Sequence, residues 1–436
     1  MSRRAPDALL TSDFRAAPYW WDAVPRPALP EVALPARADA VVIGSGYTGL
    51  SAALQLARGG RHTVVLDASD AGWGCSTRNG GQVSTGLKPG FADLAPLHGA
   101  ERAFAMVKEG HHALAFTEDF IRSEKIECRW ERVGRFIGAH NAKSYDKLAR
   151  RVANQAKGLE VEAHILPRAE QRSEIGTDAY FGGAVYPAHA ALDPALYHQG
   201  MLSRVQAAGA SVIAPCAAQS IERDGQGFKV RTVQGTIAAR DLLVATNGYT
   251  DRASPDLRRR VIPIGSYIIA TEPLDPALAS RLIPRARVVS DTRRVIFYYR
   301  LSPDRRRLLF GGRVATRESD PVLTAPMLHA EMAALFPELA RTRLSHSWAG
   351  FVAYTFDTMP HLGQRDGIWY AMGYCGAGVA LAGYFGMRVG QQMLGRKEGR
   401  TALDGMAFPT RPLYSGEPWF LGPALVWKRL LDRLPV

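Results

Sequence analysis

Three glycines near the N-terminus have the spacing of a turn that binds phosphate. Gly44, Gly46 and Gly49 lie between an apolar run at residues 39–44 and a segment at 49–59 with apolar side chains at helical spacing. In such a strand–turn–helix unit, the first glycine permits the bend, the second lets a pyrophosphate approach the backbone, and the third lets helix and strand pack closely. The helix N-terminus then offers free N–H groups to the phosphate. The spacing therefore predicts a dinucleotide site.

The residues after this unit distinguish between nucleotide cofactors. Asp67 ends a second apolar strand, where its carboxylate would accept a hydrogen bond from a ribose 2′-hydroxyl. A nicotinamide dehydrogenase would typically continue with further strand–helix units, but here a polar loop rich in glycine and serine follows at residues 69–86. The main-chain N–H groups of such a loop can form an anion-binding nest around a diphosphate. The cofactor expected here is FAD.

The polar loop also carries a recognisable element, because residues 76–82 read Ser-Thr-Arg-Asn-Gly-Gly-Gln. With this element after the ribose-binding acid, the chain resembles the D-amino-acid oxidase-like (DAO) superfamily of FAD-dependent oxidoreductases, and most closely its gamma-glutamylputrescine oxidase-like branch. The resemblance extends from Pro18 to Pro418. It implies an α/β fold (α+β overall), in which a Rossmann-type FAD-binding domain is joined to a second, mainly antiparallel β-sheet substrate domain.

The order of expected elements makes this division discontinuous. A helix is expected at 101–124, and another begins after Asp193, whose side chain would cap it ahead of Pro194. Between 261 and 310 apolar and polar residues alternate, which predicts antiparallel strands with one covered and one exposed face. The expected segments are 1–36 for an N-terminal extension; 37–110, 190–255 and 345–408 for the FAD-binding domain; 111–189 and 256–344 for the substrate domain; and 409–436 for a C-terminal tail.

The resemblance implies which residues meet FAD. Backbone near Ala218 would meet the adenine, and residues 246–248 would close the dinucleotide cleft. A helix starting near Val379 would point its N-terminus at the pyrimidine end of the flavin, where negative charge develops on reduction. Without the resemblance, an ordinary Asn-Gly turn and a buried small-residue helix fit these last two segments as well. The expected cofactor residues are Gly44, Ser45, Gly46, Tyr47, Thr48, Gly49, Asp67, Ala68, Gly74, Cys75, Ser76, Arg78, Asn79, Gly80, Gly81, Gln82, Ala218, Thr246, Asn247, Gly248, Gly376, Gly378, Val379 and Ala380.

The cysteines bear on how the flavin is held. Sarcosine oxidases, which the C-terminal part also resembles, attach the flavin through a cysteine, and Val352 stands at the matching position. FAD is therefore expected to bind non-covalently, with Cys75 packing in the phosphate-side loop. The four cysteines are far apart, with no Cys-x-x-Cys pair and no Cys/His cluster at metal-ligand spacing. We therefore expect reduced thiols and no metal site. The lack of a redox cysteine pair also indicates that the protein is not a two-nucleotide disulfide reductase.

The implied reaction is oxidation of a carbon–nitrogen single bond by hydride transfer to the flavin, giving an imine that hydrolyses. The amine must bind unprotonated, and aromatic walls that exclude water lower its pKa. The expected substrate residues are Tyr267, Tyr298, Arg300, Trp348 and Tyr374.

Strand alternation places Tyr298 and Arg300 on one face and Tyr299 on the other. Arg300 would pair a substrate carboxylate, with a structural ion pair as an equal alternative. His346 and His361 are candidate bases, although isolated histidines in such positions are more often structural.

Composition limits the class of protein. A chain of 436 residues is long enough for two domains, and its net charge of +13 comes largely from scattered arginines. The short runs at 258–260 and 305–307 lack interleaved aromatic residues, so no nucleic-acid partner is expected. No leader or membrane-spanning run is evident, which predicts a cytoplasmic protein. The C-terminal tail could form an amphipathic helix that docks on its own domain or contacts a membrane peripherally.

The sequence leaves the substrate and the electron acceptor open. The leading hypothesis is oxidation of an amine such as gamma-glutamylputrescine, with oxygen or a respiratory quinone as acceptor. A cyclic or N-methylated amino acid such as pipecolate, proline or sarcosine is the alternative substrate. Two further hypotheses are a nucleic-acid-modifying flavoprotein, supported only by the charge, and an FAD-binding subunit of a hetero-oligomeric dehydrogenase.

Overall fold

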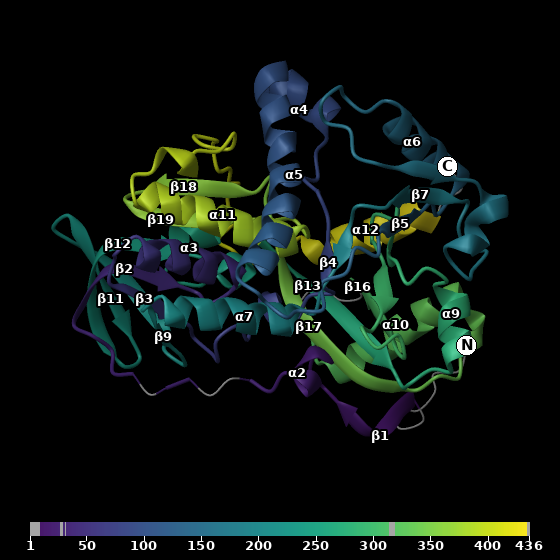
Figure 1. Cartoon of the computed structure of the whole chain (residues 1–436), viewed down its shortest axis with the longest axis horizontal. Coiled ribbons are helices and arrows are strands. Elements are labelled where there is room, and N and C mark those ends of the chain that lie inside the picture. Colours follow the sequence, from purple (N-terminus) through teal and green to yellow (C-terminus); the bar gives the residue numbers. More distant parts are fainter. Residues whose placement is uncertain (1–8, 27–28, 31, 314–318, 434–436) are drawn as a thin grey trace.

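The structure is a computed structural model that describes residues 9–26, 29–30, 32–313 and 319–433. The first eight residues of the expected N-terminal extension and the last three of the tail therefore lie outside the described residues. Most strands in the described ranges belong to two sheets at opposite ends of the long axis, with the long helix α5 (Ala100–Ser123) standing between them (Figure 1). We call them the β2 sheet and the β13 sheet.

The β2 sheet has the strand order β10-β11-β12-β2-β3-β9, with β19 beside β12 and β18 beside β19. The pairs β12–β2, β2–β3, β3–β9 and β12–β19 are parallel. Apolar side chains are buried on both faces, as in parallel sheets covered by helices. The strands are β2 (Arg37–Ile43), β3 (Thr63–Leu66), β9 (Ser211–Ile213), β10 (Ala218–Asp224), β11 (Gly227–Thr232), β12 (Gly235–Val244), β18 (His361–Arg365) and β19 (Ile368–Met372).

Two helices pack together on one face of the β2 sheet. They are α3 (Tyr47–Arg58), which follows the glycine-rich turn, and α11 (Gly378–Met393). A Cβ atom added at Gly386 of α11 would lie 2.3 Å from the Thr48 carbonyl oxygen of α3. The close approach of the two helices therefore requires glycine at this position.

The β13 sheet has the order β1-β17-β13-β16-β15-β14-β5-β7-β6. Its neighbours are antiparallel except for the parallel pairs β1–β17 and β14–β5. The strands are β1 (Leu10–Arg15), β5 (Arg135–Gly138), β6 (His164–Leu166), β7 (Gly183–Tyr186), β13 (Ile262–Thr271), β14 (Val288–Asp291), β15 (Tyr298–Leu301), β16 (Leu308–Gly312) and β17 (Leu344–Tyr354).

The prediction that one face of this sheet is exposed is wrong, because both faces are covered. Tyr299 and Phe310 pack on one side against α10 (Pro321–Leu335). On the other side, Trp348 packs with Trp20 of the short helix α2 (Trp20–Ala23). Both faces are covered because elements distant in sequence return to them, which local alternation of residue types does not reveal.

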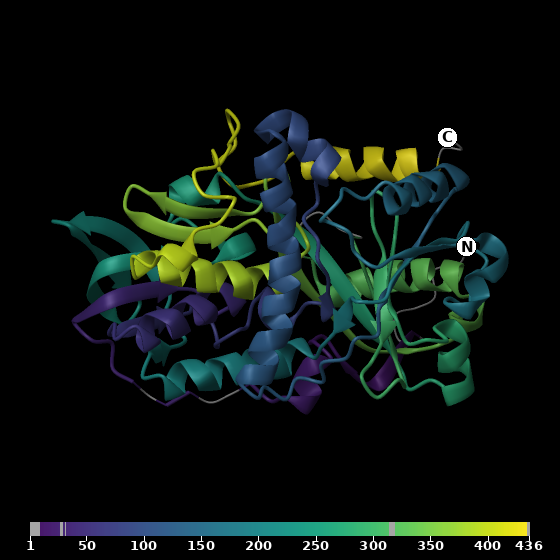
Figure 2. The same ribbon diagram turned by 45° about the horizontal axis from the view of Figure 1, so that its top comes forward.

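The remaining helices connect and flank the sheets (Figures 1 and 2). Among the described residues, no helix is long and apolar enough to cross a membrane. A short two-stranded pair joins β4 (Gln82–Val83) to β8 (Ala190–Ala191). The remaining helices are α4 (Phe91–His98), α6 (Ala142–Ala153), α7 (Pro194–Ala207), α8 (Pro255–Arg258), α9 (Pro276–Leu282) and α12 (Leu421–Arg433).

Most of the elements expected from sequence are present at the expected places. The strand expected at 39–44 is β2, and the helix expected from Gly49 begins slightly earlier, at Tyr47. The Asp193 side chain caps α7 by accepting hydrogen bonds from the Ala195 and Leu196 N–H groups, as predicted.

The expected division into domains needs one correction. Strand β17 pairs with β13 along its length, so residues 345–354 belong to the β13 sheet rather than to the sheet of the glycine-rich turn. The N-terminal extension also enters this sheet, because β1 pairs with β17. The rest of the division remains a prediction.

Candidate cofactor and substrate site

A cavity of about 360 Å³ begins at the carboxyl ends of β2 and β3 and continues to the N-terminus of α11. The carboxyl edge of parallel strands is where open α/β sheets bind ligands. Strand β17 borders the cavity through Phe351, Val352 and Ala353. The wall includes, among the residues expected to meet a cofactor, Gly44, Gly46, Tyr47, Thr48, Asp67, Ala68, Gly74, Cys75, Ser76, Asn79, Ala218, Thr246, Asn247, Gly376, Gly378 and Val379.

The glycine-rich turn depends on backbone conformation and on close contact. Gly44 has φ of +106°, which favours glycine. A Cβ atom at Gly49 would lie 1.8 Å from the Gly44 carbonyl oxygen, so a side chain there would separate α3 from β2. At Gly46 the nearest atom would be the Ser76 hydroxyl oxygen at 2.9 Å, which can move. The third glycine is therefore the least replaceable.

The N-terminus of α3 forms one wall of the cavity. Gly46 is its N-cap and provides no side-chain cap. The Tyr47 N–H donates to the Ser76 hydroxyl at 3.0 Å, which brings a second polar group to the same place. The first N–H groups of an α-helix have no partner within the helix and favour an anion. This end of the cavity therefore suits a pyrophosphate.

Asp67 lies beside the turn at the end of β3. Its Oδ2 atom accepts hydrogen bonds from the Ser45 N–H at 2.8 Å and the Ser45 hydroxyl at 2.5 Å. The Gly72 N–H in turn donates to that hydroxyl at 2.9 Å. Burial raises the pKa of the Asp67 carboxyl, while the bonds from Ser45 oppose the rise. Ser45 lies outside the wall and orients the acid expected to meet the ribose.

The loop after Asp67 is fixed by aromatic residues. The Arg78 guanidinium lies 4.0 Å from the ring centroid of Trp73 and 4.9 Å from that of Trp21 in α2. It donates to the Ala349 carbonyl oxygen of β17 at 3.0 Å. Asn79, in the wall, accepts a bond from the Gly81 N–H at 2.8 Å. Arg78 therefore fastens the loop to the β13 sheet.

Several other expected cofactor residues also lie outside the wall and hold its parts together. A Cβ atom at Gly81 would lie 2.1 Å from the Leu192 carbonyl oxygen, and one at Gly248 would lie 3.0 Å from Phe351 Cβ. The Gln82 amide donates to the Val289 and Tyr299 carbonyl oxygens. Gly49, Arg78, Gly80 and Ala380 complete this group, which the structure does not bring to the cavity surface.

The cavity wall combines the N-terminus of α11 with two thiols, of which Cys375 is buried and Cys75 is half-buried. Tyr374 borders the cavity and shares a hydrogen bond of 2.6 Å with the Thr48 hydroxyl of α3. Cys75 and Cys375 also border it. The Cys75 thiol donates to the Phe351 carbonyl oxygen at 2.7 Å, and burial raises the pKa of the Cys375 thiol. The expected packing role of Cys75 stays a prediction.

Tyr298 of the β13 sheet lies outside the cavity wall but packs against the loop that borders it. Its hydroxyl and that of Ser266 are 2.8 Å apart, and burial raises the pKa of Tyr298 to about 12. The ring lies against the loop, since a Cβ atom at Gly80 would be 3.4 Å away. Tyr299 points to the opposite side, where it meets the hydroxyl of Tyr180 at 3.0 Å.

Arg300 is used differently from the expectation. Its side chain is buried, and Nη1 donates to the carbonyl oxygens of Leu192 at 2.9 Å and Gly81 at 3.3 Å. Burial lowers its pKa to about 10. Through these bonds Arg300 joins the segments of Gly81 and Leu192. They support neither the expectation that Arg300 binds a substrate carboxylate nor the alternative that it forms a structural ion pair.

The remaining expected substrate residues and candidate bases form hydrogen bonds with other parts of the chain. Tyr267 is fully buried, and its hydroxyl accepts a bond from the Ser319 N–H at 2.9 Å. The Trp348 indole donates to the Arg78 carbonyl oxygen at 2.8 Å. His346 bonds Asp22 at 2.9 Å, and His361 bonds Asp357 at 3.0 Å. Neither histidine borders the cavity.

Two cations that sequence reasoning missed converge on Tyr354 of β17. The Arg313 Nη2 atom donates to the Tyr354 hydroxyl at 2.5 Å, and the Lys88 ammonium lies 5.7 Å from the ring centroid. Burial raises the pKa of Tyr354, but the charges of Arg313 and Lys88 outweigh it and leave the pKa below its ordinary value. A Cβ atom at Gly376, in the cavity wall, would lie 3.8 Å from the Tyr354 hydroxyl.

A buried histidine under the turn was also missed. His198 of α7 donates from Nε2 to the Ser45 carbonyl oxygen at 2.7 Å. Burial lowers the pKa of His198 to about 4, so the ring is neutral near pH 7. Its position follows from the packing of α7 beneath the turn, and no local sequence pattern marks it.

Comparison with known proteins now bears on this geometry. The sequence profile of the DAO family, described as FAD dependent oxidoreductase, matches residues 39–392. The chain belongs to the DAO family. A probable oxidoreductase OrdL of Rhizobium meliloti is 31% identical over 422 residues, which are 95% of this chain and 97% of that protein. Gamma-glutamylputrescine oxidoreductase of Escherichia coli is 30% identical over 406 residues, 91% of this chain and 93% of that protein.

Solved DAO-type structures match the fold at lower identity. Glycine oxidase from Geobacillus kaustophilus superposes with a TM-score of 0.71 at 18% identity, covering 87% of this chain and 99% of its own. L-proline dehydrogenase from P. horikoshii gives 0.67 at 17%, covering 90% and 99%. The expected fold class and DAO membership are confirmed, and the protein is an FAD-dependent oxidoreductase.

The residues of the cavity fit FAD. The wall includes Ala218 at the start of β10, Asp67 for the ribose, the α3 N-terminus for the pyrophosphate, and Gly376 with the α11 N-terminus. Cβ atoms at Gly44 and Gly49 would meet the carbonyl oxygens of Ala245 and Gly44, so these glycines let the α3 N-terminus lie close to the β2 sheet beside the cavity. An extended dinucleotide such as FAD needs contacts for its adenosine, its pyrophosphate and its flavin.

Proposed function

We propose that this DAO protein oxidises a carbon–nitrogen bond of an amine that also carries a carboxylate, as gamma-glutamylputrescine does. The observation that carries the proposal is the pair of cations, Arg313 and Lys88, at Tyr354, whose hydroxyl lies close to Gly376 in the cavity wall. The Escherichia coli relative, named for gamma-glutamylputrescine, supports the same choice.

The chain itself would supply binding, orientation and exclusion of water. Bound FAD would supply the oxidant, accepting a hydride from the carbon next to the amine nitrogen. Tyr374 is buried in the cavity wall, and Tyr298 is half-buried against the loop at Gly80. Such surroundings favour the neutral amine, because burial lowers the pKa of an ammonium group. We propose these two tyrosines as the walls around the reacting amine.

The carboxylate of the substrate would be held by Arg313, with Lys88 adding charge. Arginine binds carboxylates through two parallel N–H groups, which fixes their orientation as well as their position. Arg313 is itself oriented by its bond to the Tyr354 hydroxyl. A carboxylate fixed at this end would place the rest of the substrate along the cavity towards the flavin.

The same cations would also hold the carboxylate of pipecolate, proline or sarcosine, which makes a cyclic or N-methylated amino acid the second candidate. The two classes differ in the distance between carboxylate and reacting nitrogen. We propose that either oxygen or a respiratory quinone accepts the electrons from the reduced flavin.

An anaerobic titration of the purified protein tests the substrate class. The flavin absorbance would be followed with gamma-glutamylputrescine, pipecolate, proline and sarcosine, and with N-acetylputrescine, an amide of the same diamine that lacks the carboxylate and the α-amino group of the glutamyl part. We expect gamma-glutamylputrescine to bleach the flavin at the lowest concentration. Bleaching by pipecolate, proline or sarcosine alone would move the function to the second candidate. A yellow protein that no amine bleaches would favour the dehydrogenase-subunit hypothesis.

The attachment of the flavin is a separate proposal, that FAD is non-covalent. Val352 borders the cavity at the position where sarcosine oxidases are expected to have their cysteine, but Cys75, Cys216 and Cys375 also border it. Acid precipitation should leave all flavin absorbance in the supernatant. A yellow pellet would show a covalent bond and would direct attention to these three thiols.

A further inference from the structure

The C-terminal helix α12 presents an apolar face to solvent. Val426 is 70% exposed, Trp427 59% and Leu430 49%. At about 100° per residue, these three side chains and Pro423 share one side of the helix. Trp419, just before the helix, is 72% exposed. Contiguous exposed apolar side chains on a folded protein usually mark a contact surface.

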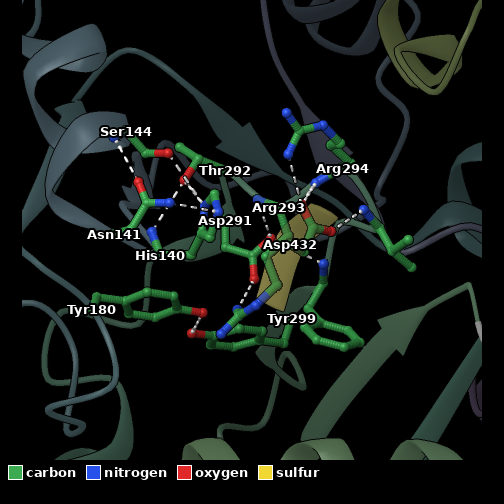
Figure 3. A network of polar contacts seen from close by, with 12 residues as sticks. His140, Asn141, Ser144, Tyr180, Asp291, Thr292, Arg293, Arg294, Tyr299 and Asp432 are labelled. Atoms are coloured by element: carbon green, nitrogen blue, oxygen red, sulfur yellow. Dashed lines mark hydrogen bonds and ion pairs between the residues drawn. The ribbon is translucent and has the colours of Figure 1, made fainter. Parts of the chain in front are cut away.

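The orientation of α12 is fixed by its opposite face. The Asp432 carboxylate accepts hydrogen bonds from the Arg294 and Val295 N–H groups, each at 3.0 Å, on the loop between β14 and β15 (Figure 3). Leu425, on that side of the helix, is half-buried. The helix therefore docks on its own domain, and its outward apolar face results from this docking.

The charges of the segment indicate what covers this face. Residues 409–436 contain Arg411, Lys428, Arg429 and Arg433 against two acids. Both acids have partners, because Asp432 anchors the helix and Glu417 pairs with Arg258 at 3.2 Å. The whole chain has a net charge of +13. An amphipathic helix with tryptophan and basic residues is typical of binding at an anionic membrane interface.

We propose that the outward face of α12 lies against an anionic lipid bilayer, with Trp427 and Val426 inserted at the headgroup boundary. Tryptophan is enriched at this depth because its ring is apolar and its N–H is polar. The Asp432 anchor would keep the helix parallel to the protein surface, so that the substrate domain faces the membrane. This contact is independent of the proposed amine substrate.

Vesicle cosedimentation of the full-length, flavin-loaded protein tests this contact. Vesicles of phosphatidylglycerol and phosphatidylcholine should bind the protein at about 0.1 M salt and bind it more weakly at about 0.5 M salt, because salt screens the attraction between basic side chains and anionic lipid. Vesicles of pure phosphatidylcholine, which carry no net charge, should also bind the protein more weakly. The double variant Val426→Ser, Trp427→Ser should partition at least about tenfold more weakly.

The matched control is Val233→Ser, Leu323→Ser, which removes two equally exposed side chains on other elements. Its binding should equal that of the unaltered protein. Equal binding of the α12 variant, or no binding to anionic vesicles, would overturn the proposal. A concentration-dependent dimer that only the α12 variant abolishes would also overturn it, by assigning the face to a second copy of the chain. All four substitutions are at the surface, so thermal unfolding should confirm that each variant folds.

Discussion

The glycine-rich turn and the β13 sheet face each other across the same cavity but are held by different kinds of contact. In the turn, backbone meets backbone within a short stretch of chain, as where Gly49 lies against the Gly44 carbonyl. Across the cavity, side chains from distant segments meet, as where Arg78 joins Trp21 and Ala349. A change in the turn should therefore act through shape, and a change in the sheet through individual polar bonds.

The largest effect is expected for Gly49→Val. The new side chain would begin 1.8 Å from a backbone oxygen that cannot move without separating α3 from β2. We expect a loss of about 4 kcal/mol or more in the free energy of unfolding, together with loss of bound FAD. Urea unfolding and flavin absorbance measure both. Gly422→Ala, where a Cβ meets nothing within 4 Å, is the control. A stable, fully yellow Gly49→Val protein would contradict the account of the turn.

Acid should weaken the turn through His198. Its pKa is about 4 in the folded protein and 6.5 ordinarily, so the unfolded chain takes up the proton first as pH falls. Stability contributed by this residue is present above pH 6.5 and is lost between 6.5 and 4. The total is about 3 kcal/mol. His198→Gln can still donate to the Ser45 carbonyl but does not titrate, so its unfolding free energy should depend less on pH. Parallel pH profiles for the two proteins would refute this role.

Arg300→Met should separate a structural arginine from a substrate-binding one. It removes the bonds to the Leu192 and Gly81 carbonyl oxygens and leaves these acceptors buried. We expect a loss of about 2 kcal/mol in stability with little change in KM for the amine. A stable variant with a greatly raised KM would restore the sequence-based expectation that Arg300 binds the carboxylate.

A smaller effect is expected for Arg78→Lys. Lysine keeps the charge but loses the planar contact with Trp73 and Trp21 and the bond to Ala349. The cost should be about 1 kcal/mol, seen as a lower melting temperature and slightly weaker FAD binding. Arg132→Lys, in an exposed ion pair with Glu118, should change stability by less than about 0.5 kcal/mol. Equal effects of the two substitutions would remove the special role of Arg78.

The difference between the two regions also explains what the sequence could predict. The turn, Asp67 and the Asp193 cap were predictable because spacing within one stretch of chain determines them. The alternation in β15 correctly separated Tyr298 from Tyr299. It could not tell that Arg300 would meet carbonyl groups, because those belong to Gly81 and Leu192.

Arg313 was overlooked for the same reason. It follows β16, and Tyr354 ends β17, so they meet only because both strands pair with β13. A basic residue at the end of a strand is too common to indicate a binding site by itself. The sequence did not reveal that both faces of the β13 sheet are covered, because α10 covers one face and α2 packs on the other, and both come from distant parts of the chain.

The central claim is that Arg313 recognises the carboxylate of the substrate, and the most direct test combines one substitution with two amines. Anaerobic flavin bleaching would be titrated with gamma-glutamylputrescine and N-acetylputrescine, for the unaltered protein and for Arg313→Met. We expect gamma-glutamylputrescine to act at concentrations at least about tenfold lower in the unaltered protein, and this preference to disappear in the variant. Equal response to both amines in the unaltered protein, or a preference that survives the substitution, would contradict the claim.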